Sequence, residues 1–257
     1  MPLFRRNKPA SPPPPQQQPG TVQAPAASSS AVSAEDCTTH SPCRELLAVP
    51  AAQRDSLLRL ILGRTRDLGP DAISVYLNDE LSARLVMMGP GESGAVQRAY
   101  AVPGHLAERW GTTPPDLLRR ALETMRGDDV EVAAHEQGET SPLYTVIDQG
   151  VSGAAHLVRL EQALGVDLPN GAIVGIPREH QILAVPIRTA RDISTIEAML
   201  NLVHDVGSRA QDRVSLDVFW LHQGRLHPFN AETKNGRLER IFPPDEFRTL
   251  LDALPRA

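Results

Sequence analysis

The chain has 257 residues, a formal net charge of −5 and an apolar fraction of 41%. This length allows one large domain or two small ones, and the apolar content is sufficient for a buried core. The negative charge argues against a protein that neutralises phosphates along a duplex, so we expect no nucleic-acid partner. No run of about 18 apolar residues occurs, so we expect no membrane-spanning helix.

Cys37 and Cys43 are the only cysteines. Two cysteines in so long a chain do not make a disulfide framework, so nothing indicates an oxidising compartment. The first residues are basic but are followed by Pro, Gln and Ser instead of the apolar run of a signal peptide. The pattern therefore predicts a cytoplasmic protein.

Cys37, His40 and Cys43 are the one cluster of soft metal ligands in the sequence. A structural zinc site takes four ligands, usually as two close pairs, and no second pair follows here. We therefore expect two surface thiols, no metal site and no cofactor.

The N-terminal segment is rich in Pro, Gln, Ala and Ser, with four consecutive prolines from Pro12 to Pro15. Such a composition buries too little apolar surface to offset the entropy lost on ordering. It predicts a disordered tail over 1–43 and a globular region over 44–257, which could divide into two fused lobes, 44–135 and 136–257. The tail is either a solubilising spacer, which we favour, or a docking peptide for a proline-reading domain.

Hydrophobic periodicity predicts the elements of the first half. We expect a helix over 51–62 that ends at Gly63, two strands over 72–77 and 81–88 joined by a short loop, and a third strand over 95–102. Thr113, two prolines and Asp116 form a strong helix start, so a helix should follow to Arg126.

In the second half, strands are predicted over 130–134 and 143–147, and a helix over 154–164 that Gly165 closes. Two apolar strands follow at 171–177 and 181–187. Ser194 and Glu197 have the spacing of a capping box before an apolar stripe that contains Met199 and Val203. A strand over 214–221 and a turn at 223–224 close the pattern, which indicates an α+β fold of mixed or antiparallel sheets with several packed helices.

Four of these segments together resemble the YtpQ-like family of bacterial proteins. They are Trp110-Gly111 with the leucine-rich helix 117–126, the strand–Pro–strand element 171–185, the helix 196–206, and the segment 214–219 with Gly224. The family often has an Arg-Asp pair soon after the central Pro, whereas Arg178 and Glu179 follow Pro177 here. The resemblance implies an α+β fold and a cytosolic bacterial protein, and it implies no assigned activity.

The turn Arg178, Glu179 and His180 is one weak candidate for a binding site. A Glu beside a His is suited to acid–base work, but neighbouring side chains on an extended backbone point to opposite faces. We favour a solvated turn. His156 and Arg159 would share one face of a predicted helix, and the leucines on its other stripe predict that this pair is exposed.

The closing hairpin offers the other candidates, Trp220 and His222, which share one face of the strand by alternation. That face is either an exposed aromatic patch for a ligand or part of the core, and we favour the core. Glu197, Asn201 and His204 follow the polar side of the preceding helix and should be solvated.

No nucleophile elbow or nucleotide fingerprint occurs, and the glycine-rich loop 89–94 lacks the Lys of a phosphate-binding loop. We therefore expect a non-catalytic binding or regulatory module, whose protein partner would dock on the closing hairpin or the Pro-rich tail. The alternative is an enzyme of unrecognised type with a polar cleft near Arg178, His180 and His222.

Overall fold

The structure is a computed structural model that describes residues 41–89, 98–234 and 237–255. The chain divides into a unit over residues 1–30, which lies outside this part, and a unit over residues 31–257, which contains all of it. The tail predicted over 1–43 therefore falls almost entirely outside the described residues. Cys37, His40 and most of the glycine-rich loop 89–94 fall outside them too.

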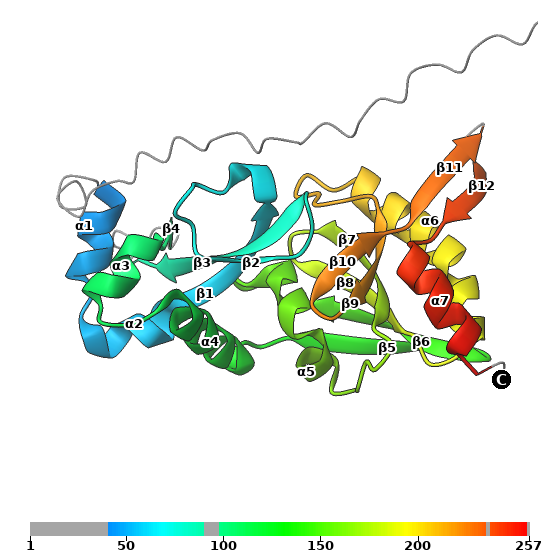
Figure 1. Ribbon diagram of the computed structural model, residues 1–257, viewed down its shortest axis with the longest axis horizontal. Coiled ribbons are helices and arrows are strands. Elements are labelled where there is room, and N and C mark those ends of the chain that lie inside the picture. Colours follow the sequence, from blue (N-terminus) through cyan, green and yellow to red (C-terminus); the bar gives the residue numbers. More distant parts are fainter. Residues whose placement is uncertain (1–40, 90–97, 235–236, 256–257) are drawn as a thin grey trace, which may run out of the picture. The chain divides into compact units, whose positions relative to one another are not determined.

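The first half of the described chain forms a four-stranded antiparallel sheet with β3 at its centre (Figure 1). Its strands are β1 (Leu58–Arg64), β2 (Ser74–Tyr76), β3 (Leu81–Met88) and β4 (Ala99–Ala101). Strand β1 pairs with one edge of β3, while β2 and β4 share the other edge. The accompanying helices are α1 (Ser41–Ala48), α2 (Ala51–Leu57), α3 (Gly104–Arg109) and α4 (Pro114–Thr124), with short 3₁₀ turns at η2 (Thr65–Asp67) and η3 (Met125–Gly127).

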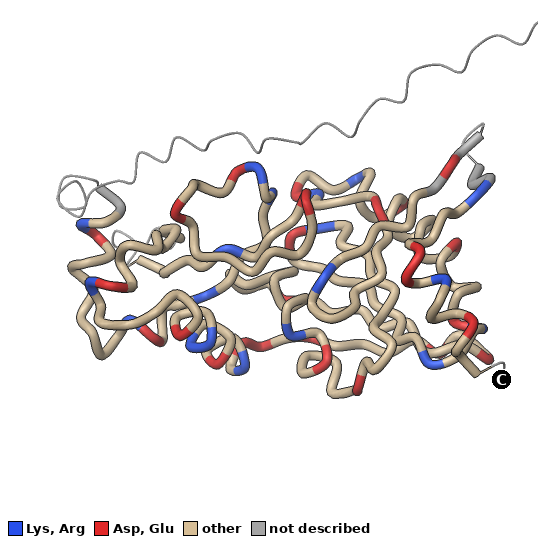
Figure 2. Tube along the Cα trace, viewed as in Figure 1, with Lys and Arg blue, Asp and Glu red and all other residues tan. Residues whose placement is uncertain are grey.

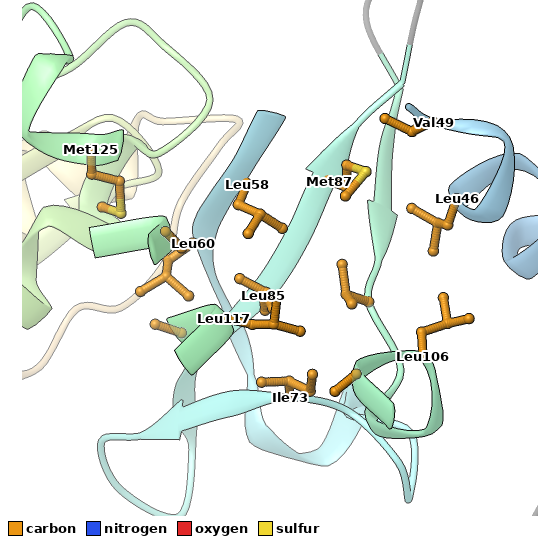
Figure 3. Packing of buried hydrophobic residues seen from close by; sticks show 14 of the residues in the cluster. Leu46, Val49, Leu58, Leu60, Ile73, Leu85, Met87, Leu106, Leu117 and Met125 are labelled. Carbon is orange, nitrogen blue, oxygen red and sulfur yellow. The ribbon is translucent and has the colours of Figure 1, made fainter. Parts of the chain in front are cut away.

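The helices cover this sheet with one apolar cluster (Figure 3). Leu58 and Leu60 alternate inward along β1, as a strand with one buried face requires. Cys43 of α1 belongs to the same cluster and is only 1% exposed. The expectation of a surface thiol was therefore wrong for this residue, because α1 packs its cysteine against the sheet.

The second half forms a six-stranded antiparallel sheet with the order β10-β9-β7-β8-β6-β5 (Figure 1). Its strands are β5 (Glu131–Gln137), β6 (Thr140–Ile147), β7 (Ala172–Arg178), β8 (Gln181–Pro186), β9 (Val218–His222) and β10 (Arg225–Pro228). The helical segments are η4 (Gly153–Arg159), α5 (Leu160–Leu164), η5 (Ala190–Ser194), α6 (Thr195–Ser208) and α7 (Asp245–Ala253). A separate hairpin joins β11 (Asn230–Lys234) to β12 (Arg237–Phe242).

Strand β7 is buried on both faces, which explains its continuous apolar sequence. Val174 packs with η4 and α5 on one face, whereas Ile173 packs with α6 and α7 on the other. Gly175 lets α6 approach the strand closely, since a Cβ there would lie 2.2 Å from Cγ2 of Val203. The sheet is thus the middle layer between two helical layers.

The α+β prediction is confirmed, and all strand pairs within the described residues are antiparallel. The predicted strands of both sheets occur close to their expected positions. The cap of α4 is also as expected, because Oγ1 of Thr113 accepts from the backbone N–H of Asp116. Within the described part of the chain, no helix has the length and apolarity to cross a bilayer.

Three local predictions were wrong. The helix predicted over 51–62 ends at Leu57, because the following residues pair with β3 and bury alternate side chains. The capping box lies at Thr189 and Asp192, while Ser194 makes no side-chain cap. The helix predicted over 154–164 is mostly a 3₁₀ segment, whose first residue Gly153 has a left-handed φ of 47°.

Candidate functional site: an acidic cleft beside a buried network

A cleft of about 620 Å³ is lined by residues of both sheets. Ser56 and Arg59 contribute from the junction of α2 and β1. Asp128 and Glu131 lie where the chain enters β5, and Asp148 follows the end of β6. The volume is in the range of ordinary small-ligand sites.

Asp148 anchors the loop that forms one wall of the cleft. One carboxylate oxygen accepts from the backbone N–H of Gly150 at 2.6 Å, and the other accepts from Gly153 at 2.8 Å and from His156 at 3.0 Å. Burial disfavours the charged carboxylate, but the hydrogen bonds from the imidazole and the two backbone groups outweigh it. They hold the pKa of Asp148 below its usual value.

His156 lies behind this wall and is completely buried, so the prediction that it is exposed was wrong. The 3₁₀ geometry of η4 turns its ring inward to Asp148 instead of outward along a regular helix. Arg159 approaches Nδ1 of His156 at 2.9 Å, and a guanidinium can only donate. Nδ1 is therefore the acceptor, and Nε2 carries the proton that the ring donates to Asp148.

Arg159 and Arg59 hold the network from two sides. Arg159 also donates to the carbonyl of Met125 at 3.1 Å, and burial lowers the pKa of its guanidinium. Arg59 pairs with Asp128 through Nε at 3.3 Å, and its Nη1 donates to two carbonyl groups at the end of α2. Both guanidinium groups thus make contacts within the chain, while Nε of Arg159 is buried without a hydrogen-bond partner among the described residues.

The charge that faces the cleft is negative. Its lining contains the carboxylates of Asp128, Asp129, Glu131 and Asp148. Arg59 and Arg159 balance Asp128 and Asp148 within the network, so the negative charge left over is that of Asp129 and Glu131. Figure 2 shows acidic and basic positions mixed along the described chain. Asp129 and Glu131 are exposed and lie outside the hydrogen-bonded network.

Asp128, Asp148 and His156 have the donor types of a metal site. Among the described residues they form the one such group, with ligand atoms within 4.8 Å of one another. A metal would need the lone pair of Nε2, but Arg159 occupies Nδ1 and leaves the proton on Nε2. Two guanidinium groups in contact with the cluster further oppose a cation at this point. With Arg59 and Arg159, the three residues form a charge-balanced hydrogen-bonded network.

The predicted turn at Arg178, Glu179 and His180 supports this network through its backbone. The carbonyl of Glu179 accepts from Ala154 at 2.6 Å, and Asp148 donates its N–H to the carbonyl of His180 at 3.1 Å. Nδ1 of His180 donates in return to the carbonyl of Asp148 at 3.0 Å. The side chains of Arg178 and Glu179 are exposed, and Arg178 pairs with Asp212 at 3.0 Å.

Trp220 is buried at 2% exposure, as predicted, and its Nε1 donates to the carbonyl of Asn170 at 2.9 Å. His222 stacks on Trp220 with ring centroids 4.5 Å apart, which confirms that the two share one face. Burial, and then the neighbouring His227, lower the pKa of His222. It lines a separate hollow of about 320 Å³ at the hairpin turn.

The predicted pair Trp220 and His222 and the predicted turn Arg178–His180 lie toward opposite ends of the strand pair β7 and β9. The register of β7 and β9 places His222 beyond Ala172, whereas Arg178 ends β7 at the other side. Seven residues of strand separate these positions along the ladder, about 20 Å. The structure therefore does not bring His222 together with the Arg178–His180 turn.

The residues of the cleft were not predicted from the sequence. One local signal points to part of it, since an Asp followed by Gly two residues later is typical of a turn that the Asp side chain caps. Asp148 and Gly150 have that spacing. No local pattern joins Arg59 or Asp128 to this turn, because those contacts depend on how the two sheets pack.

The solvated face of α6 is as predicted, with Glu197, Asn201 and His204 all exposed. Comparisons with known proteins add no further information on function, since the chain matches no family model, no curated protein and no solved structure. The resemblance to the YtpQ-like family stays a prediction.

Proposed function

We propose that this protein is a non-catalytic binding module whose acidic cleft receives a cationic amine or guanidinium group. The observation that carries the proposal is the pair of exposed carboxylates, Asp129 and Glu131, on the lining of a cleft of about 620 Å³, outside the charge-balanced network. A low-dielectric wall beside fixed carboxylates concentrates cations and disfavours anions. The same chemistry is offered by a small organic amine and by a Lys or Arg side chain of a partner protein.

The hydrogen-bond partners of the polar side chains at the cleft favour a binding role over a catalytic one. Asp148 has its oxygens occupied by three donors, and His156 is completely buried, so neither presents an unoccupied proton-transfer group to a ligand. Asp129 and Glu131 remain available at the surface of the cleft, and carboxylates there attract and orient a cation without chemistry.

The enzyme hypothesis has less support. It needs Arg178, His180 and His222 around one polar cleft, and these residues occupy opposite ends of the β7–β9 ladder. A docking site on the closing hairpin is also less favoured, because its apolar residues Trp220, Leu226 and Phe229 are buried. The cytosolic bacterial setting belongs to this proposal and rests on the composition and the resemblance described above.

Calorimetric titration of the full chain with small cations tests the proposal. Agmatine carries an amine and a guanidinium, and a neutral diol and a dicarboxylate of similar length serve as matched probes. We expect millimolar or tighter binding of agmatine, weakened by added salt, and no binding of the other two. Titration with peptides that contain or lack arginine tests whether the cleft also binds the guanidinium of a protein side chain.

A pair of variants locates the binding. The double substitution D129N and E131Q removes two exposed negative charges, so agmatine affinity should fall about tenfold while the fold is unchanged. Glu136 lies on the same strand, is equally exposed and does not line the cleft, so E136Q is the matched control. Equal losses in both variants, or equal binding of the dicarboxylate, would refute a cation site in this cleft.

A further inference from the structure

Cys43 of α1, His105 of α3 and Asp71 of the loop before β2 form a second polar constellation, and none of the three lines the cleft. Sγ of Cys43 lies 3.4 Å from Nε2 of His105, and Nδ1 of the same ring lies 2.5 Å from Oδ2 of Asp71. A thiol, an imidazole and a carboxylate in this order have the arrangement of a nucleophile, its base and the group that orients the base.

Asp71 is held against the start of α3 by several contacts. Its carboxylate also accepts from the backbone N–H of His105 at 3.1 Å, and its carbonyl accepts from Gly104 at 2.7 Å. Gly104 makes this approach possible, because a Cβ there would lie 2.5 Å from the carboxylate. The backbone of α3 therefore orients the half-exposed carboxylate of Asp71 toward His105.

This arrangement determines the tautomer of His105. A carboxylate accepts, so Nδ1 of His105 carries the proton that bonds to Asp71. The lone pair of the neutral ring is then on Nε2, directed at the sulfur of Cys43. His105 can accept the thiol proton, and Asp71 stabilises the imidazolium that results.

The thiol and its base differ in exposure. Cys43 lies on α1 among apolar side chains, and such burial disfavours a thiolate, so the stabilisation of the negative charge has to come from His105. The side chain of His105 is 19% exposed, so the base lies near the surface. Cys43 itself is 1% exposed, so a reagent reaches the sulfur only when the chain that covers it moves aside.

We propose that Cys43 is a thiol-modification site that reacts with small-molecule disulfides, with His105 as its base and Asp71 as a positioning residue. The thiol proton moves to Nε2 of His105, and the thiolate attacks one sulfur of the disulfide. A new S–S bond forms to Cys43, and the original S–S bond breaks. The second sulfur leaves as a thiolate that takes the proton back from His105, so no further oxidant or reductant is required.

The test uses the full chain with Cys37→Ser, so that Cys43 is the one thiol left. An aromatic disulfide that releases a coloured thiolate is mixed with the protein between about pH 5 and 9, and mass spectrometry identifies the modified residue. The rate should rise through a midpoint at least about one pH unit below the ordinary cysteine value of roughly 8.5. The same chain in denaturant gives the unperturbed midpoint.

Two substitutions separate base catalysis from simple burial. H105Q should move the midpoint to that of the denatured chain or above it, and D71N should move it part of the way, whereas H135Q, at an exposed histidine of β5, should leave it unchanged. A buried thiol without a base would instead titrate at or above the denatured value, and H105Q would then only speed the reaction by loosening the cover. A native midpoint at or above the denatured value, or an H105Q variant that only reacts faster, would overturn the proposal. Thermal unfolding confirms that both variants are folded.

Discussion

His156 and His105 each contact a carboxylate, yet their other partners leave different ring nitrogens as the hydrogen-bond acceptor. In His156 the guanidinium of Arg159 donates to Nδ1, so Nε2 is a donor to Asp148 and the ring has no lone pair to offer. In His105 the carboxylate of Asp71 takes the proton of Nδ1, so Nε2 presents its lone pair to Cys43. The second partner of an imidazole, more than its nearest carboxylate, decides whether it supports structure or chemistry.

The largest loss of stability should come from a substitution in the loop that positions His156. Gly153 has φ of 47°, and a Cβ there would lie 2.3 Å from the carbonyl oxygen of Glu179. We expect G153A to lower the free energy of unfolding by about 3 kcal/mol, because the strained backbone and the clash add together.

The matched control is G224A in the closing hairpin. Gly224 has φ of 74° but has no atoms near its would-be Cβ, so only the backbone strain remains, about 1 kcal/mol. Urea unfolding measures both. Equal losses would mean that the close packing of the Asp148–His156 loop against the Arg178–His180 turn contributes nothing.

Removing the charge of Asp148 should have the next largest effect. D148N leaves donors of this loop without their charged acceptor, at a cost of about 2 kcal/mol near neutral pH. Because folding lowers the pKa of Asp148, its stabilisation is present above the ordinary Asp pKa of about 4 and is lost as pH falls through the lowered value.

The variant should therefore lose part of the acid sensitivity of the native chain. Unfolding free energies measured across the acid range check this, with D205N at an exposed position of α6 as control. If D148N keeps the full native pH dependence, the hydrogen bonds to Asp148 do not stabilise its charged form.

Substitutions of the two histidines should differ by a smaller amount in their effect on the free energy of unfolding. H156Q breaks a completely buried network and should cost about 2 kcal/mol. H105Q should cost less than about 1 kcal/mol, since that side chain is partly exposed and its partner Asp71 is half exposed. Thermal unfolding of the two variants compares them, and a larger loss in H105Q would reverse the roles assigned here.

The sequence predicted those parts of the fold that depend on local pattern. The cap of α4 at Thr113 and the apolar strands β7 and β8 were found because capping and burial leave a short-range signature. The helix predicted past Leu57 failed because pairing with β3 outweighs helix propensity in that segment. Tertiary pairing of this kind has no local signal.

The candidate sites were harder to predict for the same reason. Cys43 and His105 are 62 residues apart, and Arg159 reaches Met125 across 34 residues. The Arg178–His180 turn was predicted to be solvated, and the side chains of Arg178 and Glu179 are exposed. Its backbone contacts were not predicted, because they depend on the packing of η4. Spacing rules apply within one element, whereas these groups meet only when separate elements pack.

The protonation of Nδ1 in these two rings tests the central distinction most directly. Long-range ¹H–¹⁵N spectra of the labelled full chain near neutral pH report which ring nitrogen carries hydrogen, and H156Q and H105Q assign the signals. The structure predicts an unprotonated Nδ1 in His156 and a protonated Nδ1 in His105. A protonated Nδ1 in His156, or an unprotonated one in His105, would contradict the roles of both clusters.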